Sequence, residues 1–224
     1  MKSEDNSRNM DPEPMFSVIT ASYNRGGLIE RALKSLTGQS EKDWEGIIVD
    51  DGSTDDTYSR IFPFLKADSR IRYFRKEHSG EALTKNYGIR MSSGRYITFL
   101  DSDDEYHRDH LASRKKILLQ NPGIRFLHGG VEILGNQYVP DRNDPSRPIH
   151  LKDCIIGGTF VIERETMLSL EGFRNIKLGP DSDLFERALR RGIPMMKLDL
   201  PTYIYHHENP DSITNILFGK IQDH

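Results

Sequence analysis

The amino-acid sequence predicts an α/β fold in which helices flank a mainly parallel sheet, together with a smaller mixed half. Short β-rich runs alternate with helical patterns through the first half of the chain. That alternation is typical of βαβ units, which build parallel sheets. The pattern changes to α+β after Asp104, and 224 residues with 36% hydrophobic side chains suit one core.

Four strands and three helices are predicted in the first half. The strands lie at residues 16–20, 46–49, 71–74 and 96–100. The second helix covers residues 55–65, where Pro63 should bend the helix or end it early, and the third covers 80–91. The first helix has one apolar face, made by Leu28, Ile29, Ala32, Leu33 and Leu36.

The second half contains shorter elements. A helix is predicted at residues 110–119 and a strand at 125–133, before a stretch rich in Pro and Asp at 135–148. Further strands are expected at 158–162, 195–198 and 202–205, with helices at 165–170 and 183–191. Residues 1–14 are polar and charged, so we expect a disordered leader followed by a single domain at 15–224.

The composition excludes some classes of protein. The 31 basic and 34 acidic residues nearly cancel, so no global field favours nucleic acid. No apolar stretch approaches the roughly 20 residues of a membrane span, and we expect a soluble, cytoplasmic protein. Cys154 is the only cysteine, which is typical of a reducing compartment. A small apolar residue is the commoner role for such a cysteine, with a catalytic thiol as the alternative.

An acidic run, Asp101, Ser102, Asp103 and Asp104, follows the fourth predicted strand. In an open parallel sheet ligands bind at the carboxyl ends of the strands. The repulsion between these like charges would be offset by a cation, and carboxylate oxygens suit Mg²⁺ or Mn²⁺. The alternative is a solvated turn that caps the next helix.

Two other strand ends carry candidate ligand-binding residues. Asp50 and Asp51 follow the second strand, although Asp-Gly is also ordinary turn chemistry. Tyr23 follows the first strand and could stack on a nucleobase or merely close the sheet. The sequence has no glycine-rich dinucleotide fingerprint and no phosphate-binding P-loop motif, which weakens both of those interpretations.

Two candidates lie near the end of the chain. Asp181 and Asp183 begin an amphipathic helix, so one could cap it and the other could act as a general base. His206 and His207 could bind metal or phosphate, or could be ordinary core or surface histidines.

The chain resembles family 2 glycosyltransferases, which have the GT-A fold and invert the configuration at the anomeric carbon. The matching segments occur in the same order as in that family. "SVITASYNR" is similar to the family's nucleotide-binding first strand, and "IIVDDGSTDDT" to its second strand and uridine-contacting acid. "TKNYGIRMSSGRYITFLDSDD" is similar to the stretch that ends in the D-x-D metal motif. "GPDSDLFERALRRG" resembles the segment with the catalytic base, with Pro180 where Glu is common, and "YIYHHENPDSIT" resembles the closing stretch.

The resemblance implies a role for each matching residue. It implies donor binding by Tyr23, Asp51, Lys85 and Asp103, and it implies Asp181 as the base. It also implies a divalent cation, Mn²⁺ or Mg²⁺, held by Asp101, Asp103, Asp104 and one of the histidines His206 and His207. Residues 15–104 would form the nucleotide-binding half and 105–215 the acceptor-side half.

The expected function is transfer of a single sugar from a nucleotide-diphosphate donor, with UDP-sugars favoured, to a saccharide or lipid-linked saccharide. Such an enzyme could contact the inner face of the membrane peripherally. Two rivals remain. A sugar-1-phosphate nucleotidyltransferase should carry a glycine-rich basic loop after the first strand, where this chain has only Gly26 and Gly27. A non-catalytic protein of the same fold would bind sugar nucleotides without transfer.

Overall fold

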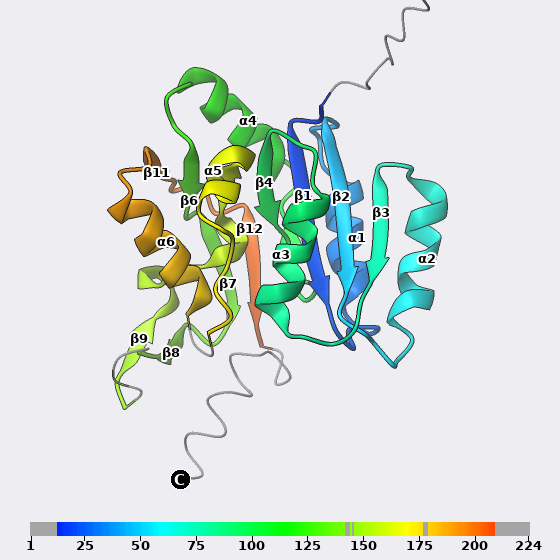
Figure 1. Ribbon diagram of the computed structural model, residues 1–224. Helices are drawn as coiled ribbons and strands as arrows, with labels where there is room; N and C mark the ends of the chain where they lie inside the picture. The colour runs from blue at the N-terminus through cyan, green and yellow to red at the C-terminus, as the bar shows by residue number, and fades with distance from the viewer. Residues whose placement is uncertain (1–12, 142–143, 145, 177–178, 209–224) are drawn as a thin grey trace, which may run out of the picture.

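The computed structural model describes residues 13–141, 144, 146–176 and 179–208, and a seven-stranded sheet forms its centre (Figure 1). All neighbouring strands in this sheet are parallel except in the two pairs that β10 makes. The predicted mainly parallel α/β fold is therefore confirmed. The strand order is β11 (Met195–Lys197), β6 (Phe126–His128), β10 (Val161–Glu163), β4 (Tyr96–Phe99), β1 (Phe16–Ser22), β2 (Trp44–Asp50), β3 (Ile71–Arg75).

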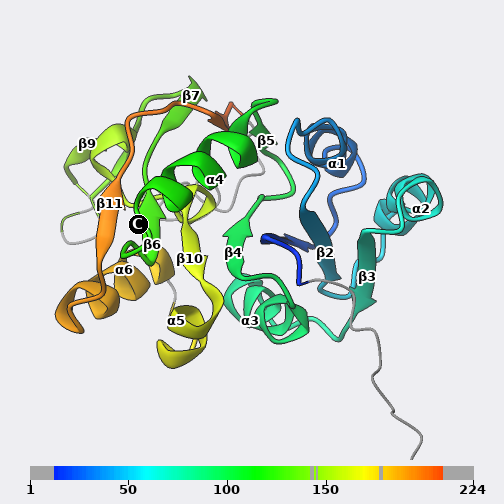
Figure 2. The ribbon, with the colours of Figure 1, turned by 90° about the horizontal axis from the view of Figure 1, so that it is seen from above.

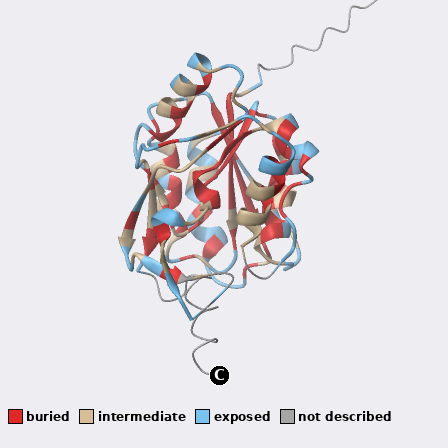
Figure 3. Ribbon diagram, turned by 90° about the vertical axis from the view of Figure 1, so that its left-hand side faces the viewer, coloured by how far each residue is buried: buried red, intermediate tan, exposed pale blue. Residues whose placement is uncertain are grey.

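Helices cover both faces of the sheet, as the two core clusters show (Figure 2). Strand side chains alternate between the faces, so Val18 packs in the core cluster under α1, whereas Ile19 packs in the cluster under α3. The central strands are almost wholly buried (Figure 3). One face carries α1 (Ile29–Thr37), α2 (Thr57–Ala67) and α4 (His110–Gln120); the other carries α3 (Glu81–Met91), α5 (Arg164–Ser169) and α6 (Pro180–Arg190).

The smaller mixed half is built on two further sheets. In the first, β12 (Tyr203–His207) lies between β5 (Glu105–Tyr106) and β7 (Val131–Gly135). The second is a hairpin of β8 (Tyr138–Pro140) and β9 (Pro148–His150), in the stretch predicted only as rich in Pro and Asp. Two short 3₁₀ turns follow, at Leu151–Asp153 and Gly157–Thr159.

The strand predicted at residues 125–133 is in fact two strands in different sheets. Gly129 and Gly130 separate β6 from β7 and have φ of +84° and +79°. A Cβ atom on Gly130 would lie 2.2 Å from the Leu200 carbonyl oxygen. This close approach and the positive φ turn the chain out of the main sheet.

Two other predictions are corrected. α2 continues past Pro63 to Ala67, because Ile61 is fully buried and Phe64 packs against the same core cluster. Residues 157–159 form a 3₁₀ turn, so the strand predicted at 158–162 begins at Val161. Residues 1–12 of the predicted leader and residues 209–224 lie outside the described residues.

The helix predicted at 183–191 begins earlier, at Pro180, because proline is favoured in the first helical turn. Gly179 is its N-cap residue, and neither Asp181 nor Asp183 caps it. The prediction that one of these acids is the cap is therefore wrong. Asp183 instead accepts a hydrogen bond from Arg187, 2.7 Å away and one turn along the helix.

Buried hydrogen bonds fix α6 against the rest of the domain. Arg187 is 8% exposed and donates to the backbone oxygens of Leu170 and Gly172 as well as to Asp183. Asn86 of α3 exchanges two hydrogen bonds of 2.8 Å with the backbone of Phe173. The loop at 170–173 thereby links α6 to α3.

Arg187→Met should destabilise the protein, because three acceptors would lose a donor that is mostly shielded from water. We expect a loss of about 2–4 kcal/mol in the free energy of unfolding, measured by urea denaturation. Arg190→Met on the exposed side of the same helix is the control and should change it by less than about 0.5 kcal/mol. Equal losses in both variants would contradict this account.

Candidate active site

The residues predicted at strand ends gather along one edge of the main sheet. β1, β2 and β4 are parallel neighbours, and their carboxyl ends lead into Tyr23, Asp51 and Asp101. The arrowheads of β1, β2 and β3 point to this edge in Figure 1. It is the edge at which an open α/β sheet binds ligands.

Asp51 is only 2% exposed and is surrounded by donors from the loop after β3. Its oxygens accept hydrogen bonds from the backbone N–H groups of Ser79 (2.9 Å) and Gly80 (2.8 Å) and from the Lys76 ammonium. Burial acts to raise the pKa of Asp51, but these hydrogen bonds outweigh it and lower the pKa. Asp51 is therefore a fixed negative charge at this edge.

His78 joins Tyr23 to Asp51. Its ring stacks on the Tyr23 ring with centroids 4.1 Å apart and planes 28° apart. Its Nδ1 atom lies 2.9 Å from Oδ2 of Asp51. Tyr23 is 41% exposed, so part of the ring faces solvent.

Lys85 of α3 is buried and connects the acidic run to the neighbouring helix. Its ammonium lies 2.8 Å from Asp101 and 2.6 Å from Glu81. Burial acts to lower the pKa of Lys85, but the charges of Asp101, Glu81 and Asp181 raise it well above its usual value. The cation therefore stays charged among three carboxylates.

Asp104 is 1% exposed and joins the acidic run to β12. The Tyr203 hydroxyl donates to it at 2.6 Å, and the His206 backbone N–H donates at 2.8 Å. Burial and the charges of Asp101 and Asp103 raise its pKa well above the usual range, against these two hydrogen bonds. This Asp104 clasp ties the end of β4 to the last strand of the described chain.

Asp103 differs from its neighbours because no other side chain in the described ranges donates a hydrogen bond to its half-buried carboxylate. Burial raises its pKa, and the charge of Asp101 adds to this, while Arg25 lowers it. Its backbone oxygen accepts a hydrogen bond from Arg31. An incoming cation would relieve the repulsion between these acids.

The two predicted histidines point to different surroundings. The ring of His206 lies beside the acidic run, with Nε2 2.7 Å from Glu105 and Nδ1 3.2 Å from Glu208. The ring of His207 instead lies 2.7 Å from the Asn136 backbone oxygen through Nδ1. Of the two, His206 is the one next to the acids.

Asp181 lies half-buried in the first turn of α6, near Lys85. The Gly157 N–H donates to its Oδ2 atom at 2.9 Å. Burial raises the pKa of Asp181 to about 6; the charges of Glu81 and Asp101 add to this, while Lys85 and the Gly157 N–H oppose it. A carboxylate with this pKa can accept a proton at neutral pH.

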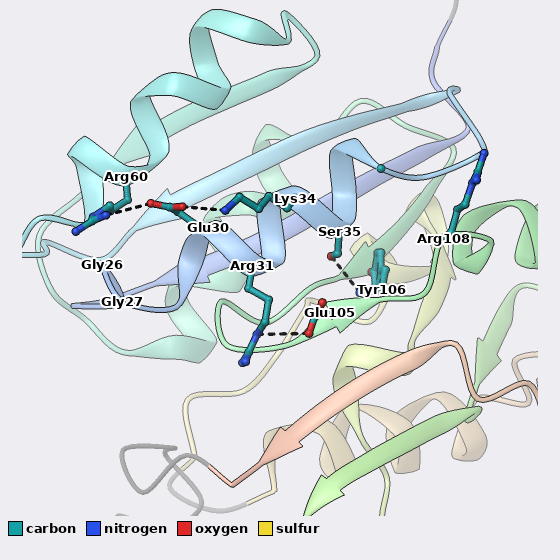
Figure 4. A pocket seen from close by; sticks show the side chains of 11 residues that line it. Gly26, Gly27, Glu30, Arg31, Lys34, Ser35, Arg60, Glu105, Tyr106 and Arg108 are labelled. Atoms are coloured by element: carbon teal, nitrogen blue, oxygen red, sulfur yellow. Dashed lines mark hydrogen bonds and ion pairs between the residues drawn. The ribbon is translucent and has the colours of Figure 1, made fainter.

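A pocket of about 850 Å³ lies beside the acidic run, between α1 and the segment that contains β5 (Figure 4). Arg31 connects the two, because it lies 3.6 Å from Glu105 and also reaches the Asp103 backbone. Glu30 pairs with both Lys34 and Arg60, so most of the basic groups here are already balanced by acids.

A second cavity of about 430 Å³ lies beside the smaller mixed half. Its lining includes the last residues of β6 and β11 together with residues 152–156. The Gly157 N–H that reaches Asp181 follows directly on this segment. The cavity therefore borders the turn that holds Asp181.

The predicted metal ligands do not converge on one point. Within the described part of the chain, no three His, Cys, Asp or Glu side chains are arranged to hold a metal ion. Asp101 and Asp104 are engaged by Lys85 and Tyr203, and Asp103 is free of such partners in the same ranges. The predicted ligand set stays a prediction, and Asp103 is the aspartate of the run that lacks such a side-chain partner in the described ranges.

Comparisons with known proteins identify the class. The family described as "Glycosyl transferase family 2" matches residues 17–125. A glycosyltransferase of Bacillus subtilis whose name, TuaG, assigns it to teichuronic acid biosynthesis is 33% identical over 188 residues, which cover 80% of this chain and 74% of that protein. The chain belongs to glycosyltransferase family 2.

Another relative is WfgD of Escherichia coli, a UDP-Glc:α-D-GlcNAc-diphosphoundecaprenol β-1,3-glucosyltransferase. It is 32% identical over 160 residues, which cover 69% of this chain and 62% of that protein. The chain thus spans between three fifths and three quarters of these two relatives.

Two solved structures share the fold. S. aureus TarS in complex with UDP-GlcNAc has a TM-score of 0.76 at 19% identity, over 88% of this chain and 60% of that one. Mannosyltransferase PcManGT from Pyrobaculum calidifontis, in complex with GDP-Man and Mn²⁺, has a TM-score of 0.70 at 19% identity, over 92% and 60%. The predicted GT-A fold is confirmed. None of the helices in the described ranges is long and apolar enough to span a membrane.

Sequence reasoning missed three residues of this edge. His78 follows the third strand, and the rule that ligands bind at strand ends could have found it. Gly157 carried no signal, because its contact with Asp181 joins positions 24 apart in the sequence. Tyr203 begins the stretch that resembles the family's closing segment, but that pattern does not show its contact with Asp104, about 100 positions away.

Tyr203→Phe should destabilise the protein, because it removes the hydroxyl donor from the buried Asp104 carboxylate. We expect the free energy of unfolding to fall by about 1–3 kcal/mol, measured by urea denaturation. Tyr138→Phe, at a ring that is 52% exposed, is the matched control and should be nearly neutral. An unchanged stability in Tyr203→Phe would show that the clasp does not depend on this hydroxyl.

Proposed function

We propose that this chain transfers a single sugar, with inversion, from a nucleotide-diphosphate donor to a hydroxyl of a saccharide acceptor. UDP-sugars are the favoured donors and lipid-linked saccharides are included among the acceptors, as in the reaction that the name of WfgD describes. The observation that carries the proposal is Asp181, whose pKa of about 6 and position near Lys85 suit a base beside the acidic run. Cell-surface polysaccharide or glycoconjugate synthesis is the proposed setting.

In the proposed reaction the acceptor oxygen attacks the anomeric carbon as the bond from that carbon to the diphosphate breaks. Asp181 takes the proton of the acceptor hydroxyl, and the nucleoside diphosphate leaves with the bonding electrons. A base on the face opposite the leaving group gives inversion without a covalent intermediate, as in inverting glycosidases. The half-buried position of Asp181 supports this role, because burial keeps its carboxylate basic.

The donor is proposed to bind along the ends of β1, β2 and β4. Tyr23 would stack on the base and Asp51 would accept from its edge, while Lys85 would lie near the diphosphate. Asp103, Asp101 and Asp104, with His206 or His207, are proposed to hold Mn²⁺ or Mg²⁺. Such an ion would offset the negative charge of the departing diphosphate. Asp103 fits this task best, because within the described ranges its carboxylate has no side-chain donor.

The acceptor is proposed to enter from the second cavity. Its position beside the Gly157 turn would bring a hydroxyl toward Asp181. Lys152 and Lys197 lie in its lining together with Asp153 and Asp199, which provides both donors and acceptors of hydrogen bonds for a saccharide.

Asp181→Asn should reduce transfer by about 10²–10⁴-fold, because the base is lost, and should leave donor binding intact. In the wild-type protein, kcat/KM should fall as the pH drops through about 6, since Asp181 must be ionised to accept a proton. Mn²⁺-dependent release of nucleotide from a panel of nucleotide sugars, with acceptor present, measures both effects.

Asp103→Asn is the matched comparison. It should abolish transfer by weakening the binding of metal and donor, measured by calorimetry with UDP and Mn²⁺. Equal loss of donor affinity in the two variants would contradict this division of roles. Donor binding without any transfer by the wild-type protein would favour the non-catalytic alternative. Formation of a nucleotide sugar from a sugar 1-phosphate would instead favour a nucleotidyltransferase.

His78→Ala should strengthen UDP binding, because His78 contacts both the ring and the carboxylate that are proposed to hold the base. A donor would have to displace a ring stacked at 4.1 Å. Such stacking is worth about 0.5–1.5 kcal/mol, so the Kd for UDP should fall by about 2–10-fold, as measured by calorimetry.

His107→Ala, at an exposed histidine on another segment, is the control for this variant. Tyr23→Ala should weaken binding, since it removes the surface on which the base stacks. If His78→Ala weakens binding as well, His78 is itself a donor contact and does not compete with the base.

A further inference from the structure

Two consecutive glycines lie between the proposed base and the acidic run. Gly157 and Gly158 begin a 3₁₀ turn and are both buried. Neither glycine has a positive φ, so the backbone conformation does not require glycine at these two positions. The lack of space does, because each glycine is in close contact with a different part of the site.

Gly157 faces Asp181. Its N–H donates to Oδ2 of Asp181 at 2.9 Å. A Cβ atom built on Gly157 would lie 2.5 Å from Oδ1, 2.6 Å from Cγ and 2.7 Å from Oδ2 of the same carboxyl group. The carboxylate therefore lies against the backbone of the turn, and any side chain at position 157 would push it away.

Gly158 faces Tyr203, whose hydroxyl forms part of the Asp104 clasp. A Cβ atom on Gly158 would lie 2.2 Å from both the hydroxyl oxygen and Cζ of Tyr203. That hydroxyl donates to Asp104 at 2.6 Å and lies 3.3 Å from Oδ2 of Asp101. Displacement of the Tyr203 ring would therefore be transmitted to the acidic run.

The turn itself is held firmly. The Thr159 hydroxyl donates to the Ile156 backbone oxygen at 2.7 Å and accepts from the Gly129 N–H at 2.9 Å. Phe160, the next residue, is fully buried between the sheet and α6 in the core cluster that contains Leu184. The backbone at 157–158 is therefore a fixed reference between α6, which carries Asp181, and β12, which carries Tyr203.

We propose that Gly157 and Gly158 are positioning residues that set the location of the Asp181 carboxylate relative to the acidic run. Gly157 seats the base through its N–H and its lack of a side chain, and Gly158 makes room for the Tyr203 ring that orients Asp104 and Asp101. The inference rests on the proposed function, because it assumes that Asp181 is the base.

Gly157→Ala tests the proposal. The methyl group should displace the carboxylate and break its bond to the N–H, so kcat should fall about 10–100-fold while the Kd for UDP with Mn²⁺ stays unchanged. That N–H favours the ionised carboxylate, so its loss should move the acid limb of the kcat/KM profile to higher pH. A role in stability alone would leave the limb in place.

A second background, Asp181→Ala, tests whether the methyl group acts through the carboxyl group. In the wild-type background Gly157→Ala should lower Tm by about 2–4 °C. In the Asp181→Ala background the clashing carboxyl group is absent, so Gly157→Ala should leave Tm unchanged. Gly158→Ala should instead raise the Kd for UDP with Mn²⁺, through Tyr203. Gly123→Ala is the control, since a Cβ atom there meets nothing within 4 Å.

The inference is overturned if Gly157→Ala keeps the wild-type rate and acid limb, or if it lowers Tm equally in both backgrounds. In either case Asp181→Asn remains inactive and the proposed function stands. Full activity of Asp181→Asn would instead refute the proposed function itself, because the base would then be another group.

Discussion

The Lys85 ammonium lies buried at the junction of α3 and the acidic run, 2.8 Å from Asp101 and 2.6 Å from Glu81. A buried cation without partners would lose its charge. The charges of Asp101 and Glu81 keep Lys85 ionised, and its ammonium in turn offsets the repulsion between these acids. Asp181 adds a third negative charge to the surroundings of Lys85. This mutual dependence explains how the domain gathers several acids at one sheet edge without being destabilised by their repulsion.

Around that cation, four aspartates of similar intrinsic acidity have different environments. Asp101 is ion-paired and Asp104 is enclosed by Tyr203 and the His206 backbone, whereas in the described ranges Asp103 lacks such a side-chain partner. Asp181 comes from another segment and keeps a pKa of about 6. The environment alone makes Asp101 an ion-pair partner and Asp104 part of the clasp. It leaves Asp103 as an open carboxylate and makes Asp181 a weak base. The members of the acid-rich motif are thus distinguished by their partners and not by their charge.

The sequence predicted the fold well because its strongest signals were local. The four strands before Asp104 and the helices between them follow from apolar periodicity, and the acids at the strand ends follow from parallel topology. The wrong element boundaries have physical causes that the apolar periodicity of the sequence does not show. Gly129 and Gly130 divide one apolar run into strands of two sheets. α2 passes through Pro63, because burial of Ile61 outweighs a local helix-breaking preference. α6 begins at Pro180, three residues before the predicted start at residue 183, so Asp181 lies in its first turn.

The site was less predictable than the fold, because its decisive contacts join distant segments. Which acid is open and which is enclosed depends on Tyr203, about 100 residues beyond the acidic run, and no local pattern shows that this tyrosine reaches Asp104. The same clasp brings β12 beside the Gly157–Thr159 turn, where Gly158 meets the Tyr203 ring and Gly157 meets Asp181. The carboxylate at the start of α6 and the acids after β4 are therefore related through one short stretch of backbone. A shift of that stretch by the width of a methyl group would change both sides of the site at once.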